Sequence, residues 1–437
     1  MHIFFSGIGG AGIGPIAQIA HQAGFEVSGS DKRDSSYIKY LQQQGLKNIH
    51  IGQEKAFIAE VHQHNPIDWF VYSSAIQFEN QNSEEIIFCQ SHNIKTSKRD
   101  LFVNYFIKKN NLKMIAIAGT HGKTTLTAMV VYLFKSLNIP ITYILPAKTS
   151  FGQMGEYNPK SLYFIYEADE FDRNFLSFKP FQSIISGLAY DHQEIYSTHT
   201  EYLKAFSQFI NQSHHTILYQ RESKLFKENV LNKVKIFDEN NPVINRIKLL
   251  GKYNRQDAYL AIQSLLDIRP KLIINNLIET INNFPGLSRR MEKIKTNLYT
   301  DYAHTPEKIQ AAINVAQELS NELKKHHQTN GKIIIVYEPL TNRRQYYIKE
   351  QYKNLFNKID QLYWVPSYLA REDPSLPILK PENLIEYLSE PKNAECQNLD
   401  QQLKNKIDQH LKNNDLVIIL SGGGGESLDE WLRKNFQ

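Results

Sequence analysis

The sequence predicts an α/β protein built on mainly parallel sheets and divided into two or three domains. Apolar strands that end at glycine or at an acidic residue alternate with helices along nearly the whole chain, which is typical of parallel sheets covered by helices. A length of 437 residues is too great for one compact core. The content of 41% hydrophobic and 22% charged residues is ordinary for a globular protein.

The first predicted domain covers residues 1–108. Its expected strands are 2–6, 25–31 and 67–76, and its expected helices are 14–24 and 37–45. Gly24 is a suitable cap for the end of the first helix. The domain is expected to end where charged residues and asparagines become frequent, within the stretch LFVNYFIKKNNLK.

The second and third predicted domains cover residues 109–286 and 287–437, with the junction in FPGLSRRME. The second has expected strands 114–119, 162–170 and 183–192, and expected helices 124–137, 256–268 and 273–284. The third has expected strands 298–304, 332–339 and 416–425, and an expected helix 306–325. All three domains therefore alternate strands with helices.

Composition limits the partners that we expect. The net charge of +5 is spread over short basic patches without an aromatic–basic platform, so the sequence gives no support for nucleic-acid binding. No apolar run could span a bilayer, and the N-terminal residues lack the pattern of a signal peptide. Cys89 and Cys396 fit a reducing compartment as two incidental thiols. We expect a cytoplasmic monomer or homodimer that acts on small molecules.

A glycine-rich loop follows the first predicted strand. Gly7, Gly9 and Gly12 have the spacing G-x-G-x-x-G, which lets a diphosphate approach the backbone at a helix N-terminus. Asp31, 19 residues after Gly12, ends the next strand and could accept a ribose hydroxyl. Alone, this loop indicates an NAD-dependent oxidoreductase, although a glycine turn can also serve only to pack a helix on a strand.

A second glycine-rich loop, GTHGKTT, covers residues 119–125. Its glycines free backbone amides to face phosphate oxygens, Lys123 supplies a cation, and the Thr124 hydroxyl can bind Mg²⁺. Only two residues separate Gly119 from Gly122, which is fewer than in the usual P-loop. The flanking strand and helix nevertheless favour an ATP-binding loop over a chance glycine turn.

Acidic residues follow the strands that neighbour this second loop. The stretch YEADEFDRNF contains Glu167, Asp169, Glu170 and Asp172, and AYDHQ contains Asp191 and His192. The carboxyl ends of parallel strands meet at one edge of a sheet, and Mg²⁺ prefers oxygen ligands. A magnesium site is therefore predicted there, although acidic residues at strand ends can also be plain surface turns.

Taken together, these motifs resemble those of the Mur ligases, which form amide bonds in peptidoglycan precursors at the expense of ATP. The resemblance covers essentially the whole chain through GIGGAG, GTHGKTT, EADE, an Asp-His pair with His192 25 residues after Glu167, GKYN, RRME and DYAHTP. It implies a Rossmann-like domain that binds a UDP-sugar, a P-loop ATPase-like central domain, and a Rossmann-like C-terminal domain that contacts nucleotide and amino acid. The two glycine-rich loops would thus hold two different nucleotides.

The resemblance also implies roles for individual residues. UDP-sugar binding is implied for Gly7, Gly9, Gly10, Ala11, Gly12, Asp31, Ser73 and Ser74. ATP binding is implied for Gly119, Thr120, His121, Gly122, Lys123, Thr124, Thr125, Asn254, Arg290 and Asp301. Metal binding is implied for Thr124, Glu167 and His192. Catalytic roles are implied for Lys123, Glu167, His192, His304 and Arg344, with His304 either a base near the amino acid or a structural histidine.

The expected reaction is the joining of L-alanine to UDP-N-acetylmuramate through an acyl phosphate, with ATP and Mg²⁺ as cofactors. The sequence departs from the family at Gly187 and Ala189, at Asp257, and at Leu340 and Thr341. The last two leave the amino acid open, so a muropeptide-recycling ligase that attaches a tripeptide is an alternative. The sequence also leaves open an ATPase without ligase activity and the NAD-dependent oxidoreductase.

Overall fold

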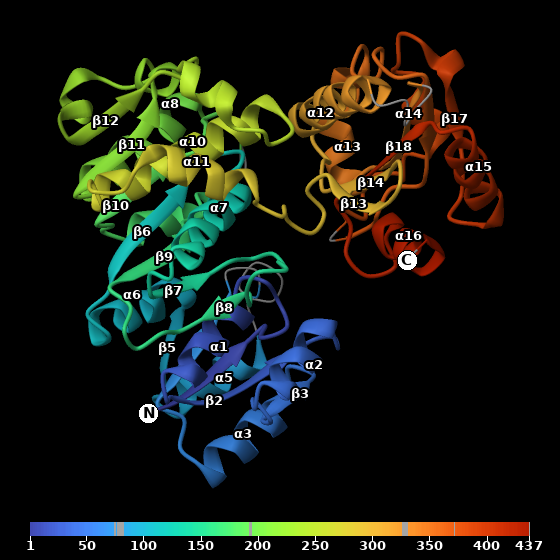
Figure 1. The fold of residues 1–437 in the computed structure, drawn as a ribbon. Coiled ribbons are helices and arrows are strands. Elements are labelled where there is room, and N and C mark those ends of the chain that lie inside the picture. Colours follow the sequence, from blue (N-terminus) through green and yellow to red (C-terminus); the bar gives the residue numbers. More distant parts are fainter. Residues whose placement is uncertain (74–75, 77–82, 192–194, 326–330, 371, 437) are drawn as a thin grey trace. The chain divides into compact units, whose positions relative to one another are not determined.

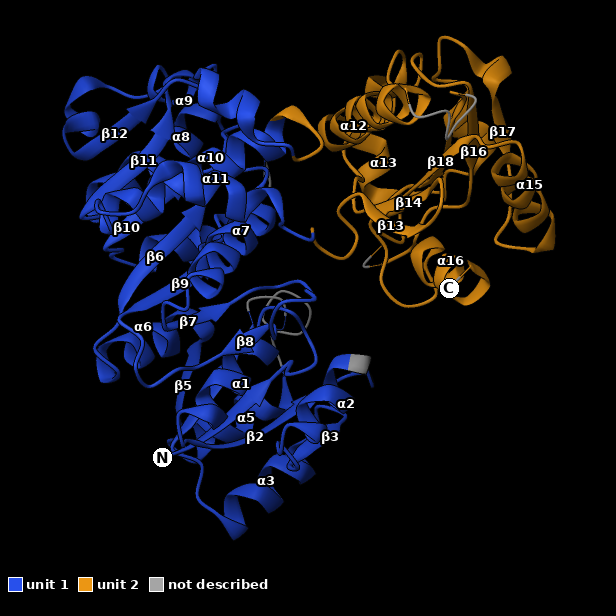
Figure 2. Cartoon of the chain, viewed as in Figure 1, with its two compact units in different colours: residues 1–248, 253–285 blue, residues 249–252, 286–437 orange. Residues whose placement is uncertain are grey.

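The structure of the protein is a computed structural model and describes residues 1–73, 76, 83–191, 195–325, 331–370 and 372–436 (Figure 1). These residues form three sheets. The chain divides into two compact units, of which the first comprises residues 1–248 and 253–285 and the second comprises residues 249–252 and 286–437 (Figure 2). Two sheets belong to the first unit and one to the second.

The N-terminal sheet is parallel throughout, with strand order β3-β2-β1-β4-β5. Its strands are β1 (His2–Ser6), β2 (Glu26–Asp31), β3 (Ile49–Ile51), β4 (Trp69–Tyr72) and β5 (Lys95–Lys98). Its helices are α1 (Gly14–Gln22), α2 (Ser36–Gln43), α3 (Lys55–His64), α5 (Glu84–Ser91) and α6 (Arg99–Lys109). Because side chains of a strand alternate between faces, Phe5 packs in the core with α1 and α6, whereas Phe4 packs with α3 and α5.

The central sheet has strand order β12-β11-β10-β6-β9-β7-β8 and is parallel except for β8. Its strands are β6 (Lys113–Ala118), β7 (Ile141–Ile144), β8 (Gly155–Glu156), β9 (Tyr163–Glu167), β10 (Gln182–Ile185), β11 (His215–Tyr219) and β12 (Val234–Phe237). The helices are α7 (Lys123–Ser136), α8 (His199–Gln212), α9 (Gln220–Ser223), α10 (Lys252–Ile268) and α11 (Ile274–Asn282), with 3-10 turns η1 (Phe171–Ser177), η2 (Glu228–Lys233) and η3 (Pro242–Arg246). Since β9 and β10 flank β6, the segments that follow these three strands meet at one edge of the sheet.

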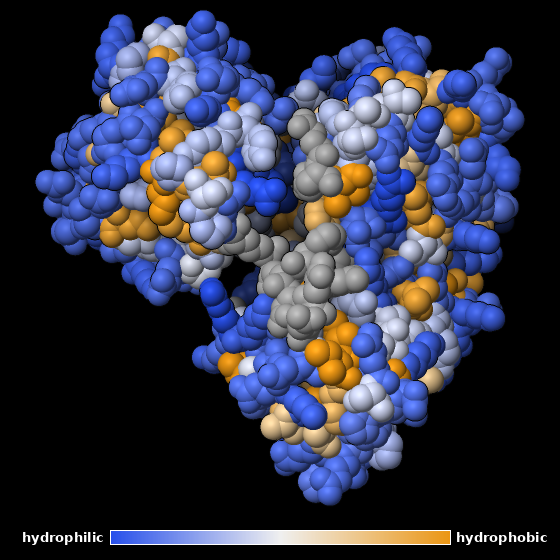
Figure 3. Space-filling model, turned by 180° about the vertical axis from the view of Figure 1, so that it is seen from behind, coloured by the Kyte–Doolittle hydropathy of each residue, from blue (hydrophilic) through white to orange (hydrophobic). Residues whose placement is uncertain are grey.

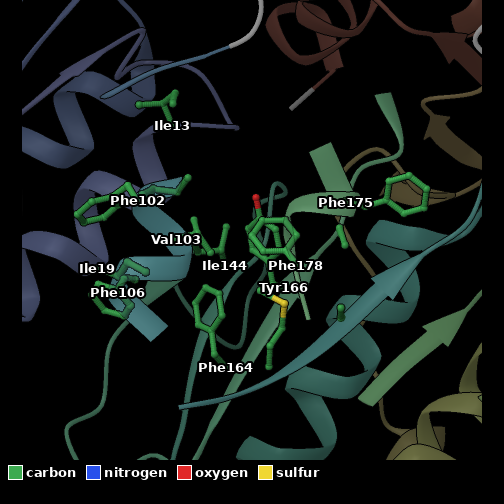
Figure 4. Packing of buried hydrophobic residues seen from close by; sticks show 14 of the residues in the cluster. Ile13, Ile19, Phe102, Val103, Phe106, Ile144, Phe164, Tyr166, Phe175 and Phe178 are labelled. Carbon is green, nitrogen blue, oxygen red and sulfur yellow. The ribbon is translucent and has the colours of Figure 1, made fainter. Parts of the chain in front are cut away.

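One hydrophobic core joins the two sheets of the first unit, and α6 is its central element (Figure 4). The ring of Phe102 lies 5.3 Å from that of Phe5 in β1, and the ring of Phe106 lies 6.3 Å from that of Phe164 in β9. The stretch where the sequence predicts the first domain to end is thus mostly a helix buried against both sheets. The domain limits at residues 108 and 286 stay predictions.

The third sheet has strand order β13-β14-β18-β15-β16-β17 and is parallel except for β13. Its strands are β13 (Glu292–Lys295), β14 (Leu298–Asp301), β15 (Ile333–Glu338), β16 (Gln361–Trp364), β17 (Ala394–Cys396) and β18 (Leu416–Ser421). Its helices are α12 (Pro306–Lys325), α13 (Asn342–Ile348), α14 (Pro381–Ile385), α15 (Gln401–Lys412) and α16 (Leu428–Phe436), with 3-10 turns η4 (Lys349–Tyr352) and η5 (Pro391–Asn393). Helix α12 packs in the core on one face, whereas α15 and α16 pack on the other.

The predicted α/β class with mainly parallel sheets is confirmed. The predicted cap of the first helix is also confirmed, because Gly24 has a φ of 82° and donates its amide to the His21 carbonyl oxygen at 3.0 Å. Among the described residues, no helix has both the length and the apolar character that crossing a membrane requires. In the face shown by Figure 3, hydrophilic residues predominate and hydrophobic residues form small separate groups.

Candidate active site

The first glycine-rich loop connects β1 to α1 and is held by the end of β2. Gly7 has a φ of 82°, in the left-handed region that favours glycine. The amides of Gly7 and Ile8 donate to the Ser30 carbonyl oxygen at 2.8 and 3.0 Å, and the Gly9 amide donates to Asp31 Oδ2 at 2.9 Å. Asp31 therefore binds the loop backbone in this structure, and its contact with a ribose stays a prediction.

The other residues predicted to bind the UDP-sugar lie in or beside the same turn. Gly10 donates its amide to the Gly7 carbonyl oxygen at 3.1 Å, and Ala11 is the exposed residue that follows. Ser73 comes directly after β4, and its Oγ would lie 3.7 Å from a Cβ added to Gly7. The structure thus brings Ser73 to the loop, while Ser74 lies outside the described residues.

Gly12 leaves room for a guanidinium group that no sequence motif indicates. A Cβ on Gly12 would lie only 2.4 Å from Arg99 Nη1. The Arg99 Nη1 group donates to the Gly12 carbonyl oxygen at 3.3 Å, and Arg99 Nη2 lies 3.7 Å from Asp169 Oδ2. The first loop is therefore connected to the acidic stretch through one arginine.

The second glycine-rich loop connects β6 to α7, and close neighbours require both of its glycines. Gly119 and Gly122 have φ values of 135° and 77°. A Cβ on Gly119 would lie 2.6 Å from Ser186 Oγ, and a Cβ on Gly122 would lie 2.6 Å from Asp257 Oδ2. The first amides of α7 have no partner within the helix, and such amides favour a bound anion.

The remaining residues of this loop occupy the positions that the motif predicts. His121 precedes Gly122, and its carbonyl oxygen accepts a hydrogen bond from Ser186 Oγ. Thr124 and Thr125 lie partly buried in the first turn of α7. Their side chains therefore belong to the helix terminus where a phosphate group is predicted.

Lys123 is held by a buried carboxylate at the start of α7. Its Nζ donates to Glu170 Oε2 and Oε1 at 2.6 and 2.9 Å and to the Gly119 carbonyl oxygen at 2.7 Å. Burial opposes the positive charge, but Glu170, Asp169 and Glu167 together raise the pKa of Lys123 above its usual value. A lysine that is charged and fixed in this way is suited to binding phosphate oxygens at the same helix terminus.

The four acidic residues after β9 have different partners. Glu167 ends the strand, beside Ile117 of β6. Asp169 pairs with Arg99, Glu170 pairs with Lys123, and Asp172 Oδ2 lies 2.5 Å from Lys98 Nζ. Three of the four are thus engaged in ion pairs within the protein. The charges of Asp169, Glu170 and Asp172 are therefore balanced by cations of the protein. Glu167 is the acidic residue of this stretch for which metal binding is implied, and that role stays a prediction.

Asp257 is a buried carboxyl group beside the second loop. It lies on α10 with an exposed fraction of 5%, and its Oδ2 faces Gly122. Burial raises the pKa of Asp257 well above its usual value, with Arg221 opposing and Glu222 adding to the shift. Asn254, the predicted adenine contact, lies one turn earlier on the same helix. The amino-terminal part of α10 therefore reaches the phosphate-binding loop of its own unit.

The predicted residues Arg290, Asp301, His304 and Arg344 belong to the second compact unit. Asp301 Oδ2 accepts a hydrogen bond from the Met291 amide at 2.9 Å. Burial raises the pKa of Asp301, and Arg290 opposes that shift. The guanidinium group of Arg290 lies 5.3 Å from the ring centroid of Tyr302. Asp301 and Arg290 are thus neighbours, as a shared role in nucleotide binding requires.

His304 is buried and packs against a glycine-rich turn. Its Nδ1 lies 2.8 Å from the Tyr302 carbonyl oxygen, and a Cβ on Gly422 would lie 2.9 Å from the His304 side chain. Burial lowers the pKa of His304 well below its usual value, and the cations of Lys308, Arg344 and Arg290 add to this effect. A neutral imidazole of low pKa is a weak base, so its predicted catalytic role stays a prediction.

Leu340 and Thr341 lie between β15 and α13. Thr341 has a φ of 56°, which is uncommon for a β-branched residue, and its amide donates to the Tyr368 carbonyl oxygen at 2.9 Å. A Cβ on Gly423 would lie 2.7 Å from the ring of Tyr368. The structure therefore places Tyr368 between the segment that departs from the family pattern and the glycine-rich turn after β18.

Comparison with known proteins establishes the family. The family model described as "Mur ligase family, catalytic domain" matches residues 2–109, and the one described as "Mur ligase, glutamate ligase domain" matches residues 289–423. The chain belongs to the Mur ligase family. As a Mur ligase it is an ATP-dependent, ADP-forming amide ligase of peptidoglycan precursor synthesis.

Relatives of this Mur ligase share moderate sequence identity over most of their length. The UDP-N-acetylmuramate–L-alanine ligase of Clostridium acetobutylicum is 27% identical over 405 residues, covering 85% of this chain and 84% of that protein. The protein of the same name from Wigglesworthia glossinidia brevipalpis is 26% identical over 488 residues, covering 98% of this chain and 95% of that protein.

Two solved structures share the fold. The UDP-N-acetylmuramate-alanine ligase of Thermotoga maritima has a TM-score of 0.77 at 20% sequence identity, covering 99% of this chain and 98% of that one. A murein peptide ligase from Psychrobacter arcticus 273-4 has a TM-score of 0.63 at 20% identity, with the same coverage. At this level of identity the likeness concerns the fold alone.

The structure accounts for one departure from the Mur ligase pattern. Thr120 Oγ1 lies 2.7 Å from the Ala189 carbonyl oxygen and accepts the Ala189 amide at 2.9 Å, and the Thr120 amide donates to the Gly187 carbonyl oxygen at 2.8 Å. These contacts use only the backbone of residues 187 and 189. Gly187 and Ala189 can therefore stand there without loss of the contact to the second loop.

The donor atoms near the second loop fit the Mg²⁺ that Mur ligases are expected to use. Thr124 lies in the helix that follows β6, and Glu167 is the last residue of the neighbouring strand β9. Both side chains are oxygen donors of the kind that Mg²⁺ prefers. His192 lies outside the described residues. Within the described part of the chain, no group of three or more His, Cys, Asp and Glu side chains could hold a metal ion.

Several residues at these edges carry no sequence motif that predicts their place. Lys98 is the last residue of β5, Arg99 is the first residue of α6, and Tyr368 follows β16. The rule that residues after parallel strands gather at one edge applies to them as it does to Glu167. Lys98 and Arg99 could not be found in this way, because a short strand of the sequence KTSK has no apolar pattern to reveal it.

Proposed function

We propose that this Mur ligase joins L-alanine to UDP-N-acetylmuramate, with ATP converted to ADP and phosphate. The observation that carries the proposal is the pair of glycine-rich loops in one compact unit, each after a parallel strand and before a helix. Two such loops suit an enzyme that brings two phosphate-bearing molecules together. Relatives named UDP-N-acetylmuramate–L-alanine ligase, aligned over most of the chain, favour this substrate and amino acid.

The proposed chemistry has two steps. An oxygen of the lactyl carboxylate forms a bond to the γ-phosphorus of ATP while the bond from that phosphorus to ADP breaks, giving an acyl phosphate. The neutral amine of L-alanine then attacks the acyl carbon, phosphate leaves, and the amine gives up a proton. The first step produces an acylating agent from a carboxylate, which is unreactive toward amines on its own.

The residues of this chain would act mainly by binding and orientation. The amides and hydroxyls of the second loop would hold the ATP phosphates, and the Lys123 ammonium would neutralise charge on the transferred group. When bound, Mg²⁺ would supply further charge neutralisation there, with Thr124, Glu167 and His192 as proposed ligands. Asn254 would contact the adenine, with Arg290 and Asp301 as further nucleotide contacts, and Arg344 would attract the carboxylate of the amino acid.

The first loop would bind the diphosphate of the UDP-sugar through the residues between Gly7 and Gly12, with Asp31, Ser73 and Ser74 as further proposed contacts. Helix α1 begins directly after this loop, and the positive end of its dipole favours such an anion. An NAD-dependent oxidoreductase would need only the first loop. That function would explain neither the second loop nor the membership of the Mur ligase family. We therefore do not retain that function.

The test is phosphate release from ATP in the presence of Mg²⁺ and UDP-N-acetylmuramate, with L-alanine, glycine, L-serine and the tripeptide L-alanyl-γ-D-glutamyl-meso-diaminopimelate supplied in turn. L-Alanine is expected to support the highest kcat/KM. Turnover with the tripeptide alone would favour the recycling reaction instead, which the departures at Leu340 and Thr341 motivate. Phosphate release that is independent of any amine would contradict both reactions.

A further inference from the structure

Three consecutive residues at the turn from β5 into α6 hold the acidic segment 169–177. Lys98 Nζ lies 2.5 Å from Asp172 Oδ2, and Arg99 Nη2 lies 3.7 Å from Asp169 Oδ2. Asp100 accepts a hydrogen bond from Ser177 Oγ. The turn thus contacts the beginning, the middle and the end of the segment.

The segment held in this way has a strained backbone. Asp172 and Arg173 have φ values of 53° and 56°, in the left-handed region that residues other than glycine rarely adopt. Such conformations persist only where surrounding contacts fix them. The contacts from residues 98–100 are among those that keep the segment in place.

Arg99 has a second contact, made by the other terminal nitrogen of its guanidinium group. Its Nη1 donates to the Gly12 carbonyl oxygen at 3.3 Å, in the first glycine-rich loop. The side chain is only 17% exposed, and the helix that begins with it is fixed by the core packing of Phe102 and Phe106 (Figure 4). A guanidinium group in this position cannot move without disturbing both the loop and the acidic segment.

The contacts continue from the acidic segment to the second glycine-rich loop. Glu170 follows Asp169 and is fully buried, and it pairs with Lys123 Nζ at 2.6 Å. The same Nζ donates to the Gly119 carbonyl oxygen at 2.7 Å. An unbroken series of contacts and one peptide bond therefore runs from Gly12 through Arg99 to Gly119.

We propose that Arg99 is a positioning residue that couples the two nucleotide-binding loops, so that a UDP-sugar bound at the first loop increases the affinity of the second loop for ATP. This inference rests on the proposed function. A ligand at the first loop fixes the backbone of Gly12 and hence Arg99. Arg99 then fixes Asp169 and Glu170, which determine the position of Lys123. Binding of the first ligand covers the entropic cost of ordering the acidic segment. That cost then no longer opposes binding of the second ligand.

The test measures the affinity of a non-hydrolysable ATP analogue by calorimetry, with Mg²⁺, in the absence and presence of saturating UDP-N-acetylmuramate. In the unaltered protein the UDP-sugar is expected to tighten binding of the analogue roughly tenfold, within the usual range of coupling between sites. In Arg99→Ala this increase is expected to fall to less than about twofold. By reciprocity, the analogue should tighten UDP-sugar binding by the same factor.

Lys98→Ala is the matched control, because Lys98 is a neighbouring cation that contacts Asp172, whereas the contact with Gly12 comes from Arg99. It is expected to keep at least half of the tenfold effect. Arg99→Lys retains the charge but lacks a planar group that can reach in two directions, so it too should lose the coupling. This variant keeps the test valid if Arg99→Ala does not fold.

The two proposals can fail separately. Equal coupling in the unaltered protein and in Arg99→Lys would overturn the role of Arg99 and leave the proposed reaction intact. Absence of coupling in an unaltered protein that binds both ligands would do the same. If the unaltered protein does not bind UDP-N-acetylmuramate at all, the proposed function is wrong, and the coupling is wrong with it.

Discussion

Glu85 is a buried carboxyl group that contacts the carboxyl ends of β1 and β2, the two strands that position the first glycine-rich loop. The hydroxyls of Ser6 and Ser30 donate to it, and Gln53 Nε2 donates to Ser6 Oγ at 2.9 Å. Burial raises the pKa of Glu85 to about 7, Asp31 adds to the shift, and the two serine hydroxyls oppose it. The folded protein therefore keeps a proton on Glu85 at pH values where the unfolded chain has lost it.

This difference makes stability depend on pH in a defined direction. The contribution of Glu85 is present below its unfolded pKa of 4.5 and is lost as the pH rises through about 7. Glu85→Gln cannot ionise at this position, so its free energy of unfolding lacks this loss. From pH 5 to pH 8 the free energy of unfolding of the unaltered protein should fall by on the order of 3 kcal/mol more than that of Glu85→Gln. Urea unfolding at the two pH values measures the change. Glu84→Gln, at the exposed neighbouring position, should behave like the unaltered protein.

Asp257 stands where the family pattern has an asparagine. Its buried environment explains how a carboxyl group can take the place of a carboxamide there. Burial raises the pKa of Asp257 well above its usual value. We therefore expect a protonated carboxyl group, which offers one donor and one acceptor, as a carboxamide does. Asp257→Asn should therefore leave kcat/KM for ATP within about threefold, a change below ~0.7 kcal/mol. Steady-state phosphate release provides the measurement. A loss of a hundredfold would show that Asp257 acts as an ionised group.

At the scale of the element, the segment after β9 holds Lys123 of α7, the residue proposed to bind the ATP phosphates, through Glu170. Lys123→Ala should abolish turnover, and it also leaves the carboxylate of Glu170, 1% exposed, without its cation. Removal of one partner of a buried pair costs roughly 3–5 kcal/mol. We expect the free energy of unfolding to fall by that order, as measured with urea. The double variant Lys123→Ala, Glu170→Gln should recover most of the stability and none of the activity.

Helix α6 packs in the hydrophobic core that joins the first two sheets. Its buried face and its exposed face can be compared by substitution. Phe102 is fully buried and contacts the rings of Phe5, Phe25 and Trp69, whereas Leu101 beside it is 53% exposed. Phe102→Ala should lower the free energy of unfolding by about 3–5 kcal/mol, and Leu101→Ala by less than about 1 kcal/mol. Similar losses in the two variants, measured by urea unfolding, would show that the Phe102 face of α6 does not carry the packing energy expected of a core contact.

The same helix shows which features the sequence could predict. Strands and helices such as β1, α1 and β9 follow from apolar periodicity, and the glycines of both loops follow from the conformations and close contacts that they require. The integration of α6 into both sheets could not be predicted, because it depends on contacts such as Phe106 to Phe164 between residues distant in sequence. The pairing of Asp169 and Asp172 with residues of the β5–α6 turn has the same origin.

At the scale of the whole molecule, the predicted site residues are distributed over two compact units. The two loops, Glu167 and Asn254 belong to the first, and His304 and Arg344 belong to the second. Motifs in the sequence could identify both sets, because GTHGKTT, GKYN and DYAHTP are recognisable without knowledge of the fold. A motif records only local pattern, however, so the division of the chain at residues 249–252 and 286 had no signal beyond the Pro and Gly near residue 285.

The division into units predicts how a ligand changes unfolding. Trp69 is the tryptophan of the first unit, and Trp364 and Trp431 report on the second. UDP-N-acetylmuramate at 100 times its Kd should stabilise the unit that binds it by about 2.7 kcal/mol. In Trp69→Phe the tryptophan fluorescence, excited selectively, comes only from the second unit, so its unfolding midpoint should hardly move on addition of the UDP-sugar. In the unaltered protein part of the signal should move. Each protein is measured with and without the UDP-sugar, so any loss of stability from Trp69→Phe itself cancels in the shift of the midpoint. An equal shift in both proteins would mean that the two units unfold together.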